Sequence, residues 1–291
     1  MTERRDDARG IDQERSVGGP RECDAGGVSG APLWHIRSPG HPTVLLCGSV
    51  RGSTATVLDP EIRDALSTAR QVWCEFPPTE VLASSPLLAL HGLSPDPLSA
   101  ALDDPLEQRL AVACERLDLD RAMLESTRPW LAAQIIDGAH STACGIESSL
   151  SIDTVISGVA VDIGVPVRYE YPTAEDAFGL FSGLRSSVEL KYLRWTLDRS
   201  IHPPRTCEAA ANAWERGSVT DLTDETNSFE LAYPELFDVL VMTRNRAWAE
   251  RIHELMHTDQ SAVVVVGAGH LVGAGAIPKL LEARGITFQP N

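Results

Sequence analysis

The 291-residue chain lacks the features that define several classes of protein. Aromatic residues make up only 5% of it, and Lys and Arg number 25 against 41 Asp and Glu, for a formal net charge of −16. Proteins that bind nucleic acid or anionic membranes concentrate Lys and Arg against phosphate, so this balance argues against both kinds of partner. The apolar share of 43% is ordinary for a globular protein and can fill a sizeable core.

The sequence also lacks the patterns of a secreted, zinc-ribbon or membrane-spanning protein. Its six cysteines include no CxxC pair and no Cys/His cluster at zinc spacing. The N-terminus has no apolar h-region, so no secretory signal is expected and a cytoplasmic location is the default. Residues 260–278 carry no Asp, Glu, Lys or Arg, but their four glycines and short apolar core predict a buried strand and a loop rather than a membrane span.

Residues 1–30 differ in composition from the rest of the chain. They contain no aromatic residue, mix both charge signs and are rich in glycine. Such a segment cannot bury enough apolar surface to offset its ordering entropy, which predicts a disordered leader. Residues 31–291 are then expected to form one α/β domain.

Two distant segments of this domain follow the same plan of strand, glycine turn, proline-started helix and strand. The first has the strand 44–47, a turn from Gly48, a helix over 61–70 that follows Asp59-Pro60, and a strand over 71–75. The second has the strand 262–266, the turn 267–270, a helix over 279–284 that follows Pro278, and a strand over 286–288. Continuous apolar strands are typical of a sheet covered on both faces. We therefore predict two βαβ-like arms of one mixed, largely parallel sheet.

The sequence between the arms is mostly helical. Residues about 86–205 predict a helical insertion that also holds a short strand over 165–170. The longest helix is expected from Pro234 to about Met256, with an inward stripe that includes Leu236, Ala247 and Trp248. Because open parallel sheets bind ligands at the carboxyl ends of their strands, we expect the site at the glycine turns.

His270, in the turn Gly267-Ala268-Gly269-His270, is the first candidate for chemistry. Its ring is placed at the end of a strand, where it can ligate a metal or act as a general base. The alternative is a packed loop histidine satisfied by a backbone carbonyl. A dinucleotide site is a weaker interpretation, because no acidic residue follows at the end of the next strand.

Two charged residues at the ends of strands are further candidates. Glu75 follows the strand 71–74 and either ends in solvent or points into the same cleft as His270. Arg51 occupies in the first arm the position that His270 has in the second. An exposed arginine is usually solvated, but at a cleft it can bind a carboxylate or phosphate.

Arg244 and Asn245 interrupt the apolar pattern of the long helix. Asn is a poor residue for a helix interior, so its presence there needs a reason. That reason is either a place in the cleft or solvent exposure.

Several short motifs, taken in order, resemble the TraB/GumN family. The match covers about residues 33–289. The motifs are Cys47-Gly48-Ser49-Val50-Arg51, the strand-end Glu75, Arg128-Pro129-Trp130-Leu131-Ala132, Val165-Pro166-Val167 ahead of Thr173, Arg244-Asn245-Arg246-Ala247-Trp248-Ala249 and Val266-Gly267-Ala268-Gly269-His270-Leu271. This family includes the TIKI metalloproteases, which trim Wnt proteins, and is distantly related to the erythromycin esterases.

The resemblance implies an α/β fold with a cleft formed by two G-x-x-H turns and acidic residues. In the TIKI branch this cleft supports metal-dependent peptide hydrolysis, so the chain is expected to be a hydrolase acting on a peptide or small molecule with a divalent Mn, Co or Zn ion. Carried over, His270 and Glu75 are the implied metal ligands and catalytic residues. The implied cleft-lining residues are Gly48, Gly267, Gly269, Arg244 and Asn245.

The chain departs from the family pattern at Arg51, which stands where the family has histidine. A guanidinium has no lone pair for a metal and adds positive charge where a ligand is needed. Metal binding is therefore expected to be weakened. Either Arg51 acts as an anion-binding catalytic group, or the chain is a catalytically silent protein that binds a peptide or small acidic ligand.

The variant Arg51→His, reconstituted with metal, separates these two interpretations. A gain of tight metal binding identifies a degenerate ancestral site. No gain indicates a cleft rebuilt around Arg51.

Overall fold

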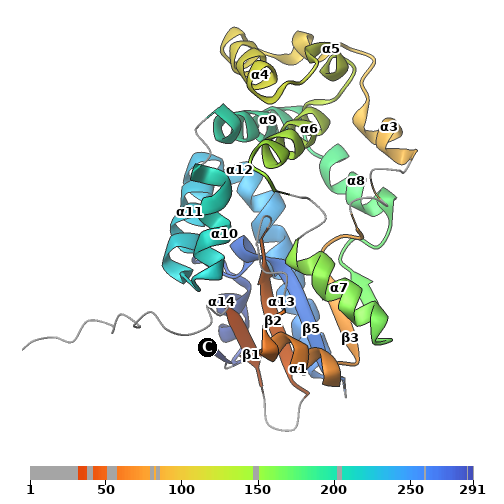
Figure 1. Ribbon diagram of the computed structural model, residues 1–291, viewed down its shortest axis with the longest axis vertical. Helices are drawn as coiled ribbons and strands as arrows, with labels where there is room; N and C mark the ends of the chain where they lie inside the picture. Colours follow the sequence, from red (N-terminus) through yellow and green to blue (C-terminus); the bar gives the residue numbers. More distant parts are fainter. Residues whose placement is uncertain are drawn as a thin grey trace, which may run out of the picture.

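The computed structural model centres on one six-stranded mixed sheet (Figure 1). The residues it describes are 32–37, 42–50, 58–78, 82, 86–146, 151–201, 205–258, 260–286 and 288–290. The sheet order is β4-β3-β5-β2-β1-β6. The strands are β1 (Leu33–Ile36), β2 (Val44–Ser49), β3 (Gln71–Cys74), β4 (Val167–Tyr169), β5 (Ala262–Gly267) and β6 (Phe288–Pro290). The predicted leader lies outside the described residues.

The strand directions confirm the mixed, largely parallel sheet. β5 pairs parallel with β2 and with β3, and β3 pairs parallel with β4. β1 pairs antiparallel with β2 and with β6. In the first arm the chain passes from β2 through helix α1 (Pro60–Thr68) to β3, and β5 lies between the two strands. In the second arm it passes from β5 through α14 (Ile277–Glu282) to β6. Both arms therefore place their turns at the same edge of the sheet.

Helices make up the rest of the described chain. Between β3 and β4 lie α3 (Leu87–Gly92), α4 (Asp104–Leu117), α5 (Arg121–Leu124), α6 (Pro129–Ala143) and α7 (Ile152–Asp162). Between β4 and β5 lie α8 (Ala174–Ser182), α9 (Ser186–Ile201), α10 (Arg205–Glu215), α11 (Val219–Ala232), α12 (Pro234–Phe237) and α13 (Thr243–Met256). No helix of the described ranges is long and apolar enough to span a lipid bilayer.

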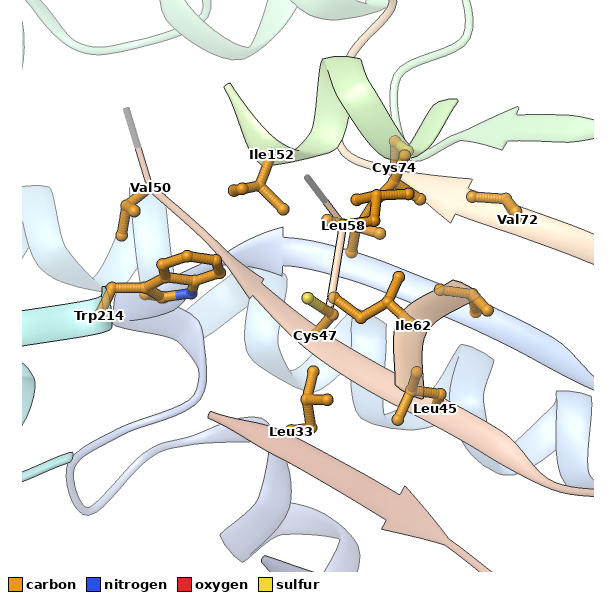
Figure 2. Close-up of a cluster of buried hydrophobic side chains, with 14 of the residues drawn as sticks. Leu33, Leu45, Cys47, Val50, Leu58, Ile62, Val72, Cys74, Ile152 and Trp214 are labelled. Carbon is orange, nitrogen blue, oxygen red and sulfur yellow. The ribbon is translucent and has the colours of Figure 1, made fainter. Parts of the chain in front are cut away.

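Buried clusters cover both faces of the sheet, as the continuous apolar strands predicted. On one face, Leu45 and Cys47 pack with α1 and α7, and Figure 2 shows Ile62 and Ile152 from these helices beside them. On the other face, Leu46 packs with residues of α13 and α14. A third cluster joins α4, α6, α8 and α9, which Figure 1 shows grouped toward one end of the molecule. The fold is a three-layer α/β/α structure with a helical part beside it.

The helix caps lie where the sequence places capping residues, but the last strand begins two residues later than predicted. Asp59 accepts a hydrogen bond from the amide of Glu61, and Thr173 forms a reciprocal capping box with Asp176. The last strand is Phe288–Pro290 rather than 286–288. The reason is that the amide of Ile286 still bonds to Leu281 and closes the end of α14 beyond Gly285, whose φ is +79°.

The long helix also differs from the prediction, because a π-helical turn, Asp238–Met242, separates α12 from α13. Within α13, Trp248 is buried as predicted, whereas Ala247 lies to the side of this inward face and is exposed. Arg244 and Asn245 precede Trp248 by four and three residues, so they share its inward face.

The helical part contains a buried ion pair. Glu189 on α9 is 2% exposed and accepts a hydrogen bond from Nη2 of Arg128 at 2.5 Å. Arg128 also donates to the carbonyls of His91 and Ser182, which ties α3 and α8 to the start of α6. This arginine opens the Arg128-Pro129-Trp130 motif, and its contacts show that the motif fastens four helices together.

Arg128→Ala should lower the free energy of unfolding by about 3 kcal/mol, because it leaves the carboxylate of Glu189 buried without its partner. Urea unfolding of the full chain measures this. The matched control is Arg185→Ala, since Arg185 is exposed and its carboxylate partner lies 4.0 Å away; its effect should stay below about 0.5 kcal/mol. Equal effects of the two variants would contradict the structural role of Arg128.

Candidate active site

Chemically active side chains collect at the carboxyl edge of the parallel strands. Glu75 directly follows β3 and Glu170 directly follows β4. The two strand ends are held side by side, because the amides of Glu170 and Tyr171 donate to the carbonyls of Cys74 and Glu75 at 2.9 and 3.1 Å. His270 ends the 3-10 turn Ala268–His270, which follows β5. This is the edge at which parallel sheets bind ligands.

A buried arginine joins the two glutamates. The Nε atom of Arg244 lies 3.0 and 3.2 Å from the two carboxylate oxygens of Glu170, and Nη2 lies 2.6 Å from Oε2. Nη2 also donates to Oε1 of Glu75. Because both side chains of an Arg–Glu pair are costly to bury alone, the guanidinium and the two carboxylates hold one another at this position.

Aromatic rings cover the same guanidinium. Phe76 and Tyr171, the residues that follow the two glutamates, are stacked with centroids 5.1 Å apart. The Cζ atom of Arg244 lies 5.4 and 5.6 Å from their centroids. Burial and the neighbouring Glu170 carboxylate raise the pKa of Tyr171 to about 12, so its hydroxyl stays neutral at physiological pH.

Asn245 fixes the orientation of His270. The Nδ2 atom of Asn245 donates to the carbonyl of Gly275 at 2.8 Å, which directs its Oδ1 atom toward the histidine. Oδ1 lies 2.6 Å from Nδ1 of His270. An amide oxygen only accepts, so Nδ1 carries the hydrogen. The partner of this buried histidine is therefore a side-chain amide and not the backbone carbonyl considered from the sequence.

His270 and Glu75 face each other through their remaining atoms. Nε2 of His270 lies 3.3 Å from Oε1 of Glu75. With the hydrogen on Nδ1, Nε2 of a neutral imidazole presents a lone pair to a carboxylate oxygen. Two carboxylates against one guanidinium also leave one negative charge unbalanced. Both facts call for a cation between Nε2 and Oε1, either a proton on the imidazole or a metal ion.

The charges around Glu75 keep its carboxyl ionised. Burial by itself would raise the pKa, but Arg244 and His270 outweigh it and hold the pKa of Glu75 well below its usual range. The backbone amide of Gly267 also donates to Oε2 at 2.6 Å. This close approach suits glycine, because a Cβ at position 267 would lie 3.3 Å from that same oxygen.

His270 and Glu75 are residue types that bind divalent metals, but they are only two ligands. Imidazole nitrogen and carboxylate oxygen are ligands of Zn, Co and Mn, and the unbalanced negative charge favours a cation. Among the residues that the structure describes, no three His, Cys, Asp or Glu side chains come together as a metal cluster. A metal held here would have His270 and Glu75 as its ligands from the described part of the chain.

Of the remaining predicted site residues, some are buried at the site and others contact neighbouring helices. Arg51 lies outside the described residues. Arg244 and Asn245 are 7% and 1% exposed, so solvent exposure does not explain them. The carbonyl of Gly48 accepts from Nε1 of Trp214 at 2.8 Å, and a Cβ on Gly269 would lie 3.5 Å from Thr226. These two glycines therefore contact the helices α10 and α11.

Sequence reasoning missed Glu170, Trp248 as a polar partner, and the pair Ser49–Asp153. Nε1 of Trp248 donates to Glu170 at 2.8 Å, and Oγ of Ser49 donates to Asp153 at 2.8 Å. A signal for Glu170 was present: it ends a short strand and precedes an aromatic residue, as Glu75 does. Asp153 carried no comparable signal, because its place at the start of α7 depends on the tertiary fold.

Glu75→Gln should lower the free energy of unfolding by about 2 kcal/mol at pH 7, since it removes an ionised partner of Arg244. Because the pKa of Glu75 is lowered on folding, the stability it contributes is present above its ordinary pKa of 4.5 and is lost as the pH falls through the folded value. The difference between wild type and variant should therefore shrink in acid. Urea unfolding between pH 7 and pH 3 measures it.

The exposed carboxylate Glu282, changed to Gln, is the matched control for this series. Its effect should be small at every pH. A difference for Glu75→Gln that stays constant or grows as the pH falls would contradict the ionised state of Glu75.

Comparison with known proteins assigns the chain to a family. No curated protein and no solved structure matches it. One family model matches residues 32–290, which is nearly the whole chain and includes every side chain of the site described above. The protein is a member of the TraB/PrgY/gumN family.

Proposed function

We propose that this protein is a hydrolase whose reactive centre is the Glu75–His270 pair. The observation that carries the proposal is the approach of His270 Nε2 to Oε1 of Glu75 at 3.3 Å. A pair of acceptors fixed in this way, by Asn245 on one side and Gly267 on the other, is arranged to hold a cation. The resemblance to the metalloprotease branch of the family supports a peptide as substrate, with a small molecule as the alternative.

Each residue of the centre has a distinct part in this proposal. Asn245 keeps the hydrogen on Nδ1 of His270, so Nε2 stays available as a ligand or a proton acceptor. Arg244 keeps Glu75 ionised. Arg51, two residues beyond β2, would bind the carboxylate or developing oxyanion of the substrate.

A divalent Mn, Co or Zn ion bound by His270 and Glu75 would lower the pKa of a bound water and polarise a carbonyl group. The side chains themselves supply the fixed orientation and the negative charge. Both depend on hydrogen bonds within the protein, those of Asn245 and of Arg244.

A second candidate is a catalytically silent protein that binds a small acidic ligand. One observation favours it: both oxygens of Glu75 already have protein partners, Arg244 and Gly267. A carboxylate with such partners can serve as a structural counter-ion rather than as a metal ligand or base.

Elemental analysis after incubation with Mn²⁺, Co²⁺ or Zn²⁺ should find near-stoichiometric metal in the wild type and little in His270→Ala. The control is His253→Ala, because His253 in the last turn of α13 and His257, which follows the helix, have ring centroids 4.5 Å apart and can collect metal at the surface. Metal retained in His253→Ala places it at His270.

Metal-loaded protein should then hydrolyse members of a peptide and ester panel, and Glu75→Gln should abolish the activity. If none of the three metals is retained, the metal-dependent hydrolase is wrong. The binding protein then becomes the better hypothesis, and the next experiment is a search for anionic ligands.

A further inference from the structure

Glu170 is the one member of the buried charge centre that the proposed reaction does not use. Its side chain is 13% exposed, and its oxygens bind Nε and Nη2 of Arg244 and Nε1 of Trp248. Burying a carboxylate is costly, and an apolar side chain of similar size would fill the space at lower cost. The charge of Glu170 therefore needs an explanation beyond packing.

Adjacent strands present the two glutamates as a matched pair. β3 ends in Glu75-Phe76 and β4 ends in Glu170-Tyr171, and the backbone ladder keeps the two dipeptides in register. Their carboxylates bind one guanidinium, and their rings stack beside it. Arg244 thus contacts both strand ends, and Glu75 lies 3.3 Å from His270.

The guanidinium of Arg244 makes more hydrogen bonds to Glu170 than to Glu75. Glu170 accepts from two nitrogens, Nε and Nη2, whereas Glu75 accepts from Nη2 alone. A two-point contact fixes the plane of a guanidinium, and a single contact does not. The orientation of Arg244 is consequently set by Glu170, and Arg244, together with the Gly267 amide on Oε2, sets the position of Glu75 Oε1 against His270.

We propose that Glu170 is a positioning residue for the reactive pair, and this proposal rests on the function proposed for Glu75 and His270. Glu170 anchors Arg244 so that its Nη2 meets Glu75 without turning the carboxylate away from Nε2 of His270. It also supplies the second carboxylate that leaves the centre negative. Without that charge Arg244 would neutralise Glu75 fully, and the pair would no longer attract a divalent cation.

Three variants test this proposal by titration calorimetry of the full chain with Mn²⁺, Co²⁺ or Zn²⁺ alone. Glu170→Gln keeps the size of the side chain and removes its charge, and it should weaken metal binding about 10- to 100-fold. Glu170→Asp keeps the charge but shortens the side chain, and it should bind metal more tightly than Glu170→Gln. Glu235→Gln, which removes an exposed carboxylate paired with Lys191, should change affinity less than about twofold.

The order of the two Glu170 variants separates positioning from packing. A residue that only fills space tolerates the isosteric Gln better than the shorter Asp. Tighter metal binding by Glu170→Gln than by Glu170→Asp would therefore overturn the proposal.

A second readout does not depend on metal. In the metal-free wild type and in Glu170→Gln, the ¹⁵N resonances of the His270 ring report the surroundings of each nitrogen. The Nε2 resonance should move in the variant while the Nδ1 resonance, held by Asn245, stays in place. If the wild type binds no metal, the proposed metal site fails, but a shifted Nε2 resonance still supports Glu170. Unmoved resonances overturn its role.

Discussion

The structure depends on one buried guanidinium. Arg244 is enclosed by the ends of two strands and by two aromatic rings, and its charge has to be met by carboxylates at that point. To neutralise the charge of Arg244, β3 and β4 have to lie side by side, and α13 has to present Arg244 to their ends. Burial lowers the pKa of Arg244, but the two glutamates raise it by more. The side chain therefore stays a cation at any ordinary pH. The geometry around His270 follows from this constraint.

The polar centre joins three parts of the fold. Glu75 belongs to the first arm, Glu170 to the strand that emerges from the helical part, and His270 to the second arm. Asn245 connects the long helix to both the turn of His270 and the carbonyl of Gly275. Hydrophobic clusters hold the layers together, whereas this network determines how the strand ends are arranged with respect to one another.

Much of this architecture could be predicted from the sequence, because its signals are local. Continuous apolar runs predicted β2 and β5, and Asp59-Pro60 predicted the start of α1. The spacing of the glycine turns predicted the two arms. The places of Glu75 and His270 at strand ends made a shared cleft one of two interpretations, the other being that Glu75 ends in solvent. For Arg244 and Asn245 the sequence left a place in the cleft and solvent exposure as alternatives, because the carboxylates that allow a guanidinium to be buried lie 169 and 74 residues away in the chain. Glu170 was missed although it ends a strand before an aromatic residue, as Glu75 does, since its pairing with Arg244 is a tertiary contact.

The distances along the chain between members of the centre have a consequence for folding. Arg244 is 169 residues from Glu75, and the amide of Gly267 that binds Glu75 is 192 residues from it. Contacts of such long range require the intervening loops to be closed, which costs conformational entropy. Because Gly267 ends β5 and Glu75 follows β3, their hydrogen bond requires these two strands to have paired. The contact between Glu75 and His270 therefore forms only once both arms have come together in one sheet.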